Sequence, residues 1–77
     1  MRITVIVHGH LRHTSAVGAD EFTFSLPDTA GVRIRDLLET LNIMEEEIRE
    51  VTVDGRRVRM DRTLHGRMRI EFFPKGR

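Results

Sequence analysis

The sequence predicts an α+β fold in which one main helix packs on a mixed sheet of four to five strands. Segments with the alternating apolar and polar residues of strands flank a single segment with the apolar repeat of a helix. A later Asp54–Gly55 pair, set between the short runs Val-Thr-Val and Arg-Arg-Val, is typical of a hairpin turn. The chain has 77 residues, so residues 1–77 are expected to form one domain around one core.

Two strands are predicted in the first part of the chain, at 2–8 and 21–26. In the first, β-branched residues dominate, and Ile3, Val5 and Val7 fall on one face. In the second, Phe22 and Phe24 fall on one face and polar residues on the other. Pro27 stops this second strand because its nitrogen cannot donate a hydrogen bond to a neighbouring strand.

The helix is predicted where apolar residues recur at the spacing i, i+3, i+4 and i+7. These residues are Ile34, Leu37, Leu38 and Leu41. They form one apolar stripe, and the residues between them are polar or charged. Asn42 follows directly and suits the left-handed conformation that often ends a helix.

The last third of the chain is predicted to supply the remaining strands. Residues 44–50 are compatible with a loop or with one helical turn, whereas 51–58 are predicted to form the hairpin. A final strand is expected from about Met68 to Phe73, ending at Pro74. The leucines of a lone helix can be buried only against a face of the sheet, so the helix must cross it. An early hairpin, a crossing helix and then further strands is the order of the β-grasp fold.

Composition restricts the function. The chain has no cysteine, which excludes disulfides, zinc–thiolate sites and a cysteine nucleophile and fits a cytoplasmic protein. The apolar N-terminal run is too short for a signal segment, and nothing approaches the length of a membrane span, so no membrane partner is expected. Charge is segregated: 36–50 holds six acids and one base, whereas 51–77 holds eight bases and three acids.

Neither a metal site nor a catalytic site is predicted. His8, His10 and His13 are close in sequence, but no carboxylate follows at ligand spacing. The serines lack the context of a nucleophile, and three adjacent glutamates at 45–47 cannot converge as an acid–base pair. There is no glycine-rich phosphate loop. The sequence is therefore expected to be that of a non-enzyme without a bound cofactor.

The arginines of the predicted hairpin form a possible surface for anionic ligands. Arg56, Arg57 and Arg59 are dense enough to meet phosphates of a nucleic acid. The chain has no tyrosine or tryptophan to stack on bases, however, and acids are interleaved with these arginines. The alternative is that they coat the solvated side of the hairpin and pair in part with the acidic middle, so nucleic acid is not the expected partner.

The residues after the last strand are predicted to project from the body of the protein. Pro74 ends the ladder of hydrogen bonds, and Lys75, Gly76 and Arg77 follow it. Glycine has no side chain, so a tail that carries it fits a narrow channel on another protein. An unstructured chain end without a role is the other interpretation.

Four segments together resemble the MoaD/ThiS family of ubiquitin-like sulfur carriers. They are "VHGHLRHT", "LPDTAGVRIRDLLETLNI", "VTVDGRRV" and "LHGRMRIEFFP". The second resembles the Leu-Pro, linker and Asp-Leu-Leu helix of that family, and the third its Val-Asn-Gly hairpin. The fourth is similar to its closing strand with Phe-Pro, although the usual acidic turn is basic here. The resemblance covers most of the chain and implies a ubiquitin-like β-grasp fold.

The resemblance also implies a function in cofactor biosynthesis. Carriers of this family are not enzymes: an activating adenylyltransferase adenylates the C-terminal carboxylate, which becomes a thiocarboxylate and passes its sulfur to an accepting enzyme. Here the carrier residues would be Gly76 and Arg77, which stand where the family has Gly-Gly. Partner docking would involve Phe73, Pro74 and Arg67. Without the Gly-Gly chemistry, the same fold would serve as a protein-interaction module.

Overall fold

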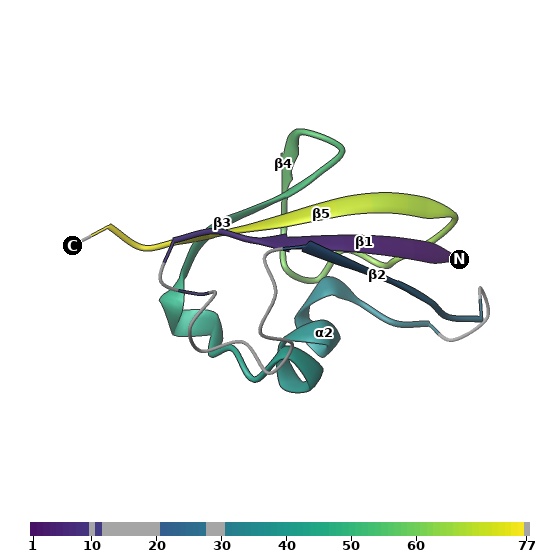
Figure 1. Cartoon of the computed structure of the whole chain (residues 1–77), viewed down its shortest axis with the longest axis horizontal. Helices are drawn as coiled ribbons and strands as arrows, with labels where there is room; N and C mark the ends of the chain where they lie inside the picture. The colour runs from purple at the N-terminus through teal and green to yellow at the C-terminus, as the bar shows by residue number, and fades with distance from the viewer. Residues whose placement is uncertain (10, 12–20, 28–30, 77) are drawn as a thin grey trace.

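The protein is a five-stranded mixed sheet with one main helix across one face (Figure 1). The computed structural model describes residues 1–9, 11, 21–27 and 31–76. The elements in chain order are β1 (Arg2–Val7), β2 (Glu21–Ser25), α2 (Ile34–Leu41), the 3₁₀ helix η2 (Glu45–Glu47), β3 (Ile48–Val53), β4 (Arg56–Val58) and β5 (Arg67–Pro74). The predicted order of strands and helix is confirmed.

The last strand lies at the centre of the sheet. The strand order is β2-β1-β5-β3-β4. β5 runs parallel to β1 and antiparallel to β3, and the two hairpin pairs β1–β2 and β3–β4 are antiparallel. A parallel pair needs a crossover connection, and the segment with α2 is part of the one that joins β1 to β5. This arrangement is the expected β-grasp topology.

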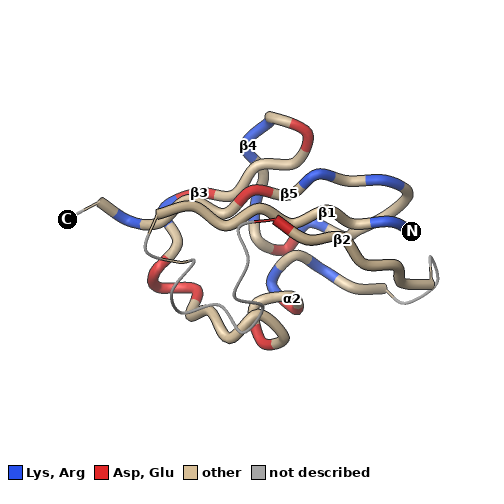
Figure 2. The backbone as a smooth tube through the Cα atoms, viewed as in Figure 1, with Lys and Arg blue, Asp and Glu red and all other residues tan. Residues whose placement is uncertain are grey.

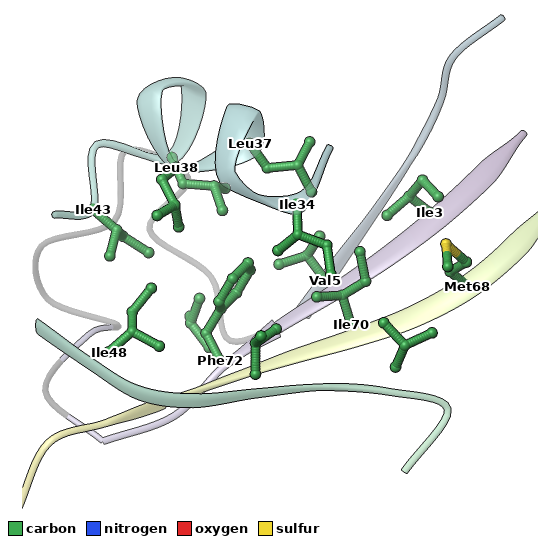
Figure 3. Close-up of a cluster of buried hydrophobic side chains, with 14 of the residues drawn as sticks. Ile3, Val5, Ile34, Leu37, Leu38, Ile43, Ile48, Met68, Ile70 and Phe72 are labelled. Atoms are coloured by element: carbon green, nitrogen blue, oxygen red, sulfur yellow. The ribbon is translucent and has the colours of Figure 1, made fainter. Parts of the chain in front are cut away.

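The helix buries its apolar stripe on the sheet as the spacing predicted. Figure 3 shows Ile34, Leu37 and Leu38 of α2 pointing toward side chains of β1 and β5. The four stripe residues of α2 are buried, and so is Phe72 at the centre of the sheet. Asn42 ends the helix with φ of 59°, in the left-handed conformation that was predicted for it.

The hairpin turn lies at Asp54 and Gly55, as the sequence predicted. Asp54 and Gly55 have φ angles of 52° and 84°, as a two-residue hairpin turn of type I′ requires. Val51 lies opposite Val58 across the hairpin. A carboxylate oxygen of Asp54 accepts the backbone N–H of Arg69 at 3.1 Å, which ties the turn to β5.

Element boundaries differ from the predictions by a few residues. The segment 44–50, left open between a loop and a helical turn, contains the 3₁₀ turn η2 and the start of β3, which begins at Ile48 rather than Val51. β5 is one residue longer at each end than predicted and includes Pro74, which lies opposite Ile48. Most of residues 9–20, between the first two predicted strands, lies outside the described residues. No helix in the described ranges is long and apolar enough to cross a membrane.

Candidate functional site

The candidate site is the end of the sheet from which β5 leaves. At this end Phe73 lies opposite Glu50 and Pro74 opposite Ile48 of β3. The N–H of Lys75 donates to the carbonyl oxygen of Glu47 in η2 at 3.0 Å. Beyond this bond the chain runs outward from the ends of the strands, as Figure 1 shows. The body of the protein therefore holds the chain as far as Lys75.

Gly76 is the first described residue past that anchor. It is exposed, and a Cβ built on it meets no atom within 4 Å. The backbone at this point can therefore be approached from any side, as insertion into a cleft of another protein requires. Arg77, the other predicted carrier residue, lies outside the described residues.

A histidine from β1 covers the last part of β5. Nε2 of His8 lies 2.9 Å from Oε1 of Glu71, and the two side chains are 38% and 22% exposed. The imidazole also stacks on the ring of Phe73, with 4.5 Å between centroids and 4° between planes. Phe73 is consequently half-buried, whereas the family resemblance implied an exposed docking residue. It still contributes apolar surface next to the tail.

Gly9 and Pro74 form a second contact beside the tail. Gly9 has φ of +58°, a conformation that glycine adopts without strain. A Cβ added to Gly9 would lie 2.8 Å from Cγ of Pro74, so only glycine lets the proline ring come this close. The contact packs the last residue of β5 against the residue that follows His8. In the sequence Gly9 only follows the first predicted strand, and nothing local to it signals a partner 65 residues away.

The three predicted docking residues do not form one cluster. Arg67 and Phe73 share the sheet face opposite α2, because alternate residues of β5 point to the same side. Six residues separate them along the strand, however, which is about 20 Å at 3.3 Å per residue. Arg67 instead lies directly opposite Arg2 of β1, at the other end of the sheet. The structure groups Phe73 and Pro74 near the tail and leaves Arg67 remote.

The arginines of the hairpin are exposed and partly paired with carboxylates. Nε of Arg57 lies 3.6 Å from Glu50, and Nε of Arg59 lies 4.0 Å from Asp61. A groove of about 530 Å³ separates the hairpin from η2. The charged residues that line it are Glu45, Glu46, Arg49, Glu50, Arg57, Arg59 and Lys75. Because both signs are present, this groove suits a phosphate backbone poorly.

The structure provides no support for the histidine cluster as a metal site. Within the described residues, no group of three or more histidine, cysteine, aspartate or glutamate side chains could hold a metal ion. His8 is engaged with Glu71 and Phe73, whereas His10 and His13 lie outside the described residues.

Comparisons with known proteins agree with the fold. The structure is similar to one described as molybdopterin converting factor, subunit 1, from Pyrococcus furiosus, with TM-score 0.69 and 25% sequence identity. That match covers 96% of this chain and 97% of the other. Two structures of small archaeal modifier protein 1 from Haloferax volcanii match with TM-scores of 0.71 and 0.69 at 10% and 11% identity. They cover 99% and 95% of this chain and 97% and 95% of theirs.

No protein-family model matches the sequence, and no curated protein matches it. The structural matches confirm the expected resemblance to MoaD-like β-grasp proteins. At 10% and 11% identity, the likeness to the modifier proteins concerns the fold alone.

Proposed function

We propose that the chain is a sulfur carrier of the MoaD/ThiS type, whose C-terminal carboxylate is activated by a partner adenylyltransferase. The observation that carries this proposal is the exit of the tail from the central strand of a β-grasp sheet, anchored at Lys75 and open at Gly76. The 25% identity to a molybdopterin converting factor subunit over nearly the whole chain favours the same conclusion.

The proposed reaction requires no catalytic group from the chain itself, only its C-terminal carboxylate. The carboxylate attacks the α-phosphorus of ATP and pyrophosphate leaves, which gives an acyl adenylate. Hydrosulfide from a sulfur donor then attacks the acyl carbon. AMP departs with one former carboxylate oxygen, a proton is released, and a thiocarboxylate remains. The adenylyltransferase supplies the catalytic groups, so the chain acts as substrate and then as sulfur donor to an accepting enzyme.

The role of the chain is to present its tail and to dock. Lys75 stays on the body through its bond to Glu47, so the segment that enters the partner's channel begins at Gly76. The reacting carboxylate would belong to Gly76 after trimming, or to Arg77 without it. The half-buried Phe73 and Pro74 flank this exit and provide the apolar contact by which a partner would grip the body.

The test is the intact mass of the protein after incubation with candidate adenylyltransferases from its own source, ATP and a sulfur donor. We expect a mass change that matches the exchange of one oxygen for sulfur, with or without loss of Arg77, and no such exchange without ATP. Deletion of residues 76–77 should abolish the modification and leave the melting temperature unchanged. A control carrier of the MoaD/ThiS type runs in the same assay. An unmodified mass beside a modified control would refute carrier function.

A second candidate is a protein-interaction module with no covalent chemistry. The observation that favours it is the pair of bulky side chains around Gly76, where carriers of this family have Gly-Gly. Arg77 follows Gly76, and if Arg77 is trimmed, Lys75 takes the penultimate position. This candidate predicts that Phe73→Ala weakens binding to the partner whereas deletion of 76–77 does not. Phe22→Ala is the matched control, because Phe22 is also half-buried but lies on β2. Loss of binding on tail deletion would exclude this candidate.

A further inference from the structure

The two edges of the sheet are protected to different degrees. β4 is an edge of only three residues, and two of them are the arginines Arg56 and Arg57. Short strands and exposed charges are devices that prevent an edge from pairing with another chain. β2 forms the opposite edge with five residues, of which only Glu21 is charged. Figure 2 shows β2 in tan apart from red at one end. This edge lacks lysine, arginine and proline.

The backbone hydrogen-bonding groups of β2 point either toward β1 or away from it, and the register shows which residue does which. Met1 and Leu26 exchange two bonds, of 2.6 and 3.0 Å, between their backbone groups. Bonded and non-bonded pairs alternate along an antiparallel ladder. In the register of β1 and β2, the backbone groups of Glu21, Thr23 and Ser25 therefore point away from β1. Within the described part of the chain, no strand pairs with them.

An apolar groove runs beside this edge. It has a volume of about 530 Å³ and separates β2 from α2. Its apolar lining is Phe22, Phe24, Leu26, Val32, Leu37 and Leu41. The rings of Phe22 and Phe24 lie 5.8 Å apart and both residues are only half-buried. An added strand would meet aromatic side chains as well as unpaired backbone groups.

We propose that a second copy of this chain occupies the edge, with the two β2 strands antiparallel about a twofold axis at Thr23. In this register the backbone N–H and C=O groups of Thr23 form two hydrogen bonds with those of Thr23 of the partner subunit. These are the backbone groups that point away from β1. Phe22 then lies directly opposite Phe24 of the partner subunit, where side chains are close and aromatic pairs stabilise a sheet. The four rings would close the two grooves along the shared edge.

Self-complementarity is what identifies the occupant as another copy. Glu21 falls opposite Ser25 of the partner subunit, so the axis brings no two carboxylates face to face. Glu21 is also neutralised within its own chain, since Nη1 of Arg69 lies 3.3 Å from its Oε1. A five-residue strand pair buries less surface than a standard interface, and we expect a Kd of about 0.1 mM. This inference does not depend on carrier function, because β5 and its tail lie two strands away from the edge.

The test uses opposite charges at the position on the proposed axis. Thr23 is exposed in the single chain, so Thr23→Lys and Thr23→Glu should fold normally. In the dimer each variant places like charges directly opposite, which should raise the Kd at least about fivefold. An equimolar mixture places lysine opposite glutamate and should restore association to at least the wild-type level. Thr63→Lys, an exposed change between β4 and β5, is the control of equal charge.

Association is measured by sedimentation velocity from micromolar to millimolar protein, with amide NMR shifts recorded over the same range. We expect concentration-dependent mass in the wild type and the control, with amide shifts concentrated at Thr23 and Ser25. A wild type that stays monomeric throughout would overturn the proposal and leave the edge to an extended segment of another protein. A dimer that tolerates Thr23→Lys, or a mixture that fails to associate, would refute the register.

Discussion

Replacing Gly9 by alanine tests whether the contact with Pro74 determines where β5 ends. The substitution meets two separate obstacles. A residue with a Cβ costs about 1–2 kcal/mol in the left-handed conformation, and Gly9 has φ of +58°. The new Cβ would also lie 2.8 Å from Cγ of Pro74, whose ring cannot rotate away. Such overpacking costs about 1–3 kcal/mol, and we take the lower end because the site is near the surface.

The free energy of unfolding should therefore fall by about 2–3 kcal/mol, or about 10–20 °C in melting temperature for a domain of this size. Urea unfolding followed by circular dichroism measures it. Gly66→Ala is the matched control: its φ is +62°, but a Cβ there meets nothing within 4 Å. In Gly66→Ala the free energy of unfolding should fall only by the cost of the left-handed conformation, about 1–2 kcal/mol.

A double variant separates the two terms. In a Pro74→Ala background the proline Cγ is gone, so Gly9→Ala should cost no more than Gly66→Ala does. If Gly9→Ala and Gly66→Ala destabilise the protein equally in the wild-type background, Pro74 does not restrict Gly9 and the reasoning is wrong. A large loss that persists without the proline ring would refute it as well.

Two further substitutions test the packing around the site. His8→Ala removes the ring stacked on Phe73, and because the imidazole is partly exposed we expect a loss of only about 0.5–1 kcal/mol in urea unfolding. The exposed His65→Ala should change almost nothing, and an equal effect of both would exclude the stacking as the cause. Phe72→Ala empties a fully buried position and should cost about 3–5 kcal/mol, a large part of the roughly 4–12 kcal/mol expected for this chain. Retention of a wild-type melting temperature would refute the burial of Phe72.

Local patterns in the sequence predicted the elements of this fold well. The apolar spacing of α2 and the Asp54–Gly55 turn are properties of neighbouring residues, and the structure bears out both. The start of β3 was harder to predict, because the three glutamates of η2 carry no apolar period to separate a turn from a loop. The β-grasp order followed from the need to cover a lone helix.

The candidate site depends on register between distant segments, and local patterns do not contain it. His8 meets Glu71 across 63 residues because β1 and β5 are parallel neighbours, with Ile6 opposite Glu71. A shift of one residue in that pairing would send the side chains of β5 to the other face. The separation of Arg67 from Phe73, in contrast, could be predicted, since six residues of a strand span about 20 Å.

The central position of β5 bears on both proposals. The strand is paired on each side, with β1 along Arg67–Phe72 and β3 along Ile70–Pro74, so the tail leaves from a firmly held part of the sheet. When a partner binds Gly76 in a channel, the hydrogen bonds of β5 to β1 and to β3 keep the strand in place. The body of the protein should therefore stay folded while the tail is bound. Self-association would use β2, which pairs only with β1 in the described chain. The two surfaces lie on different strands, so a dimer could present two tails for activation at the same time.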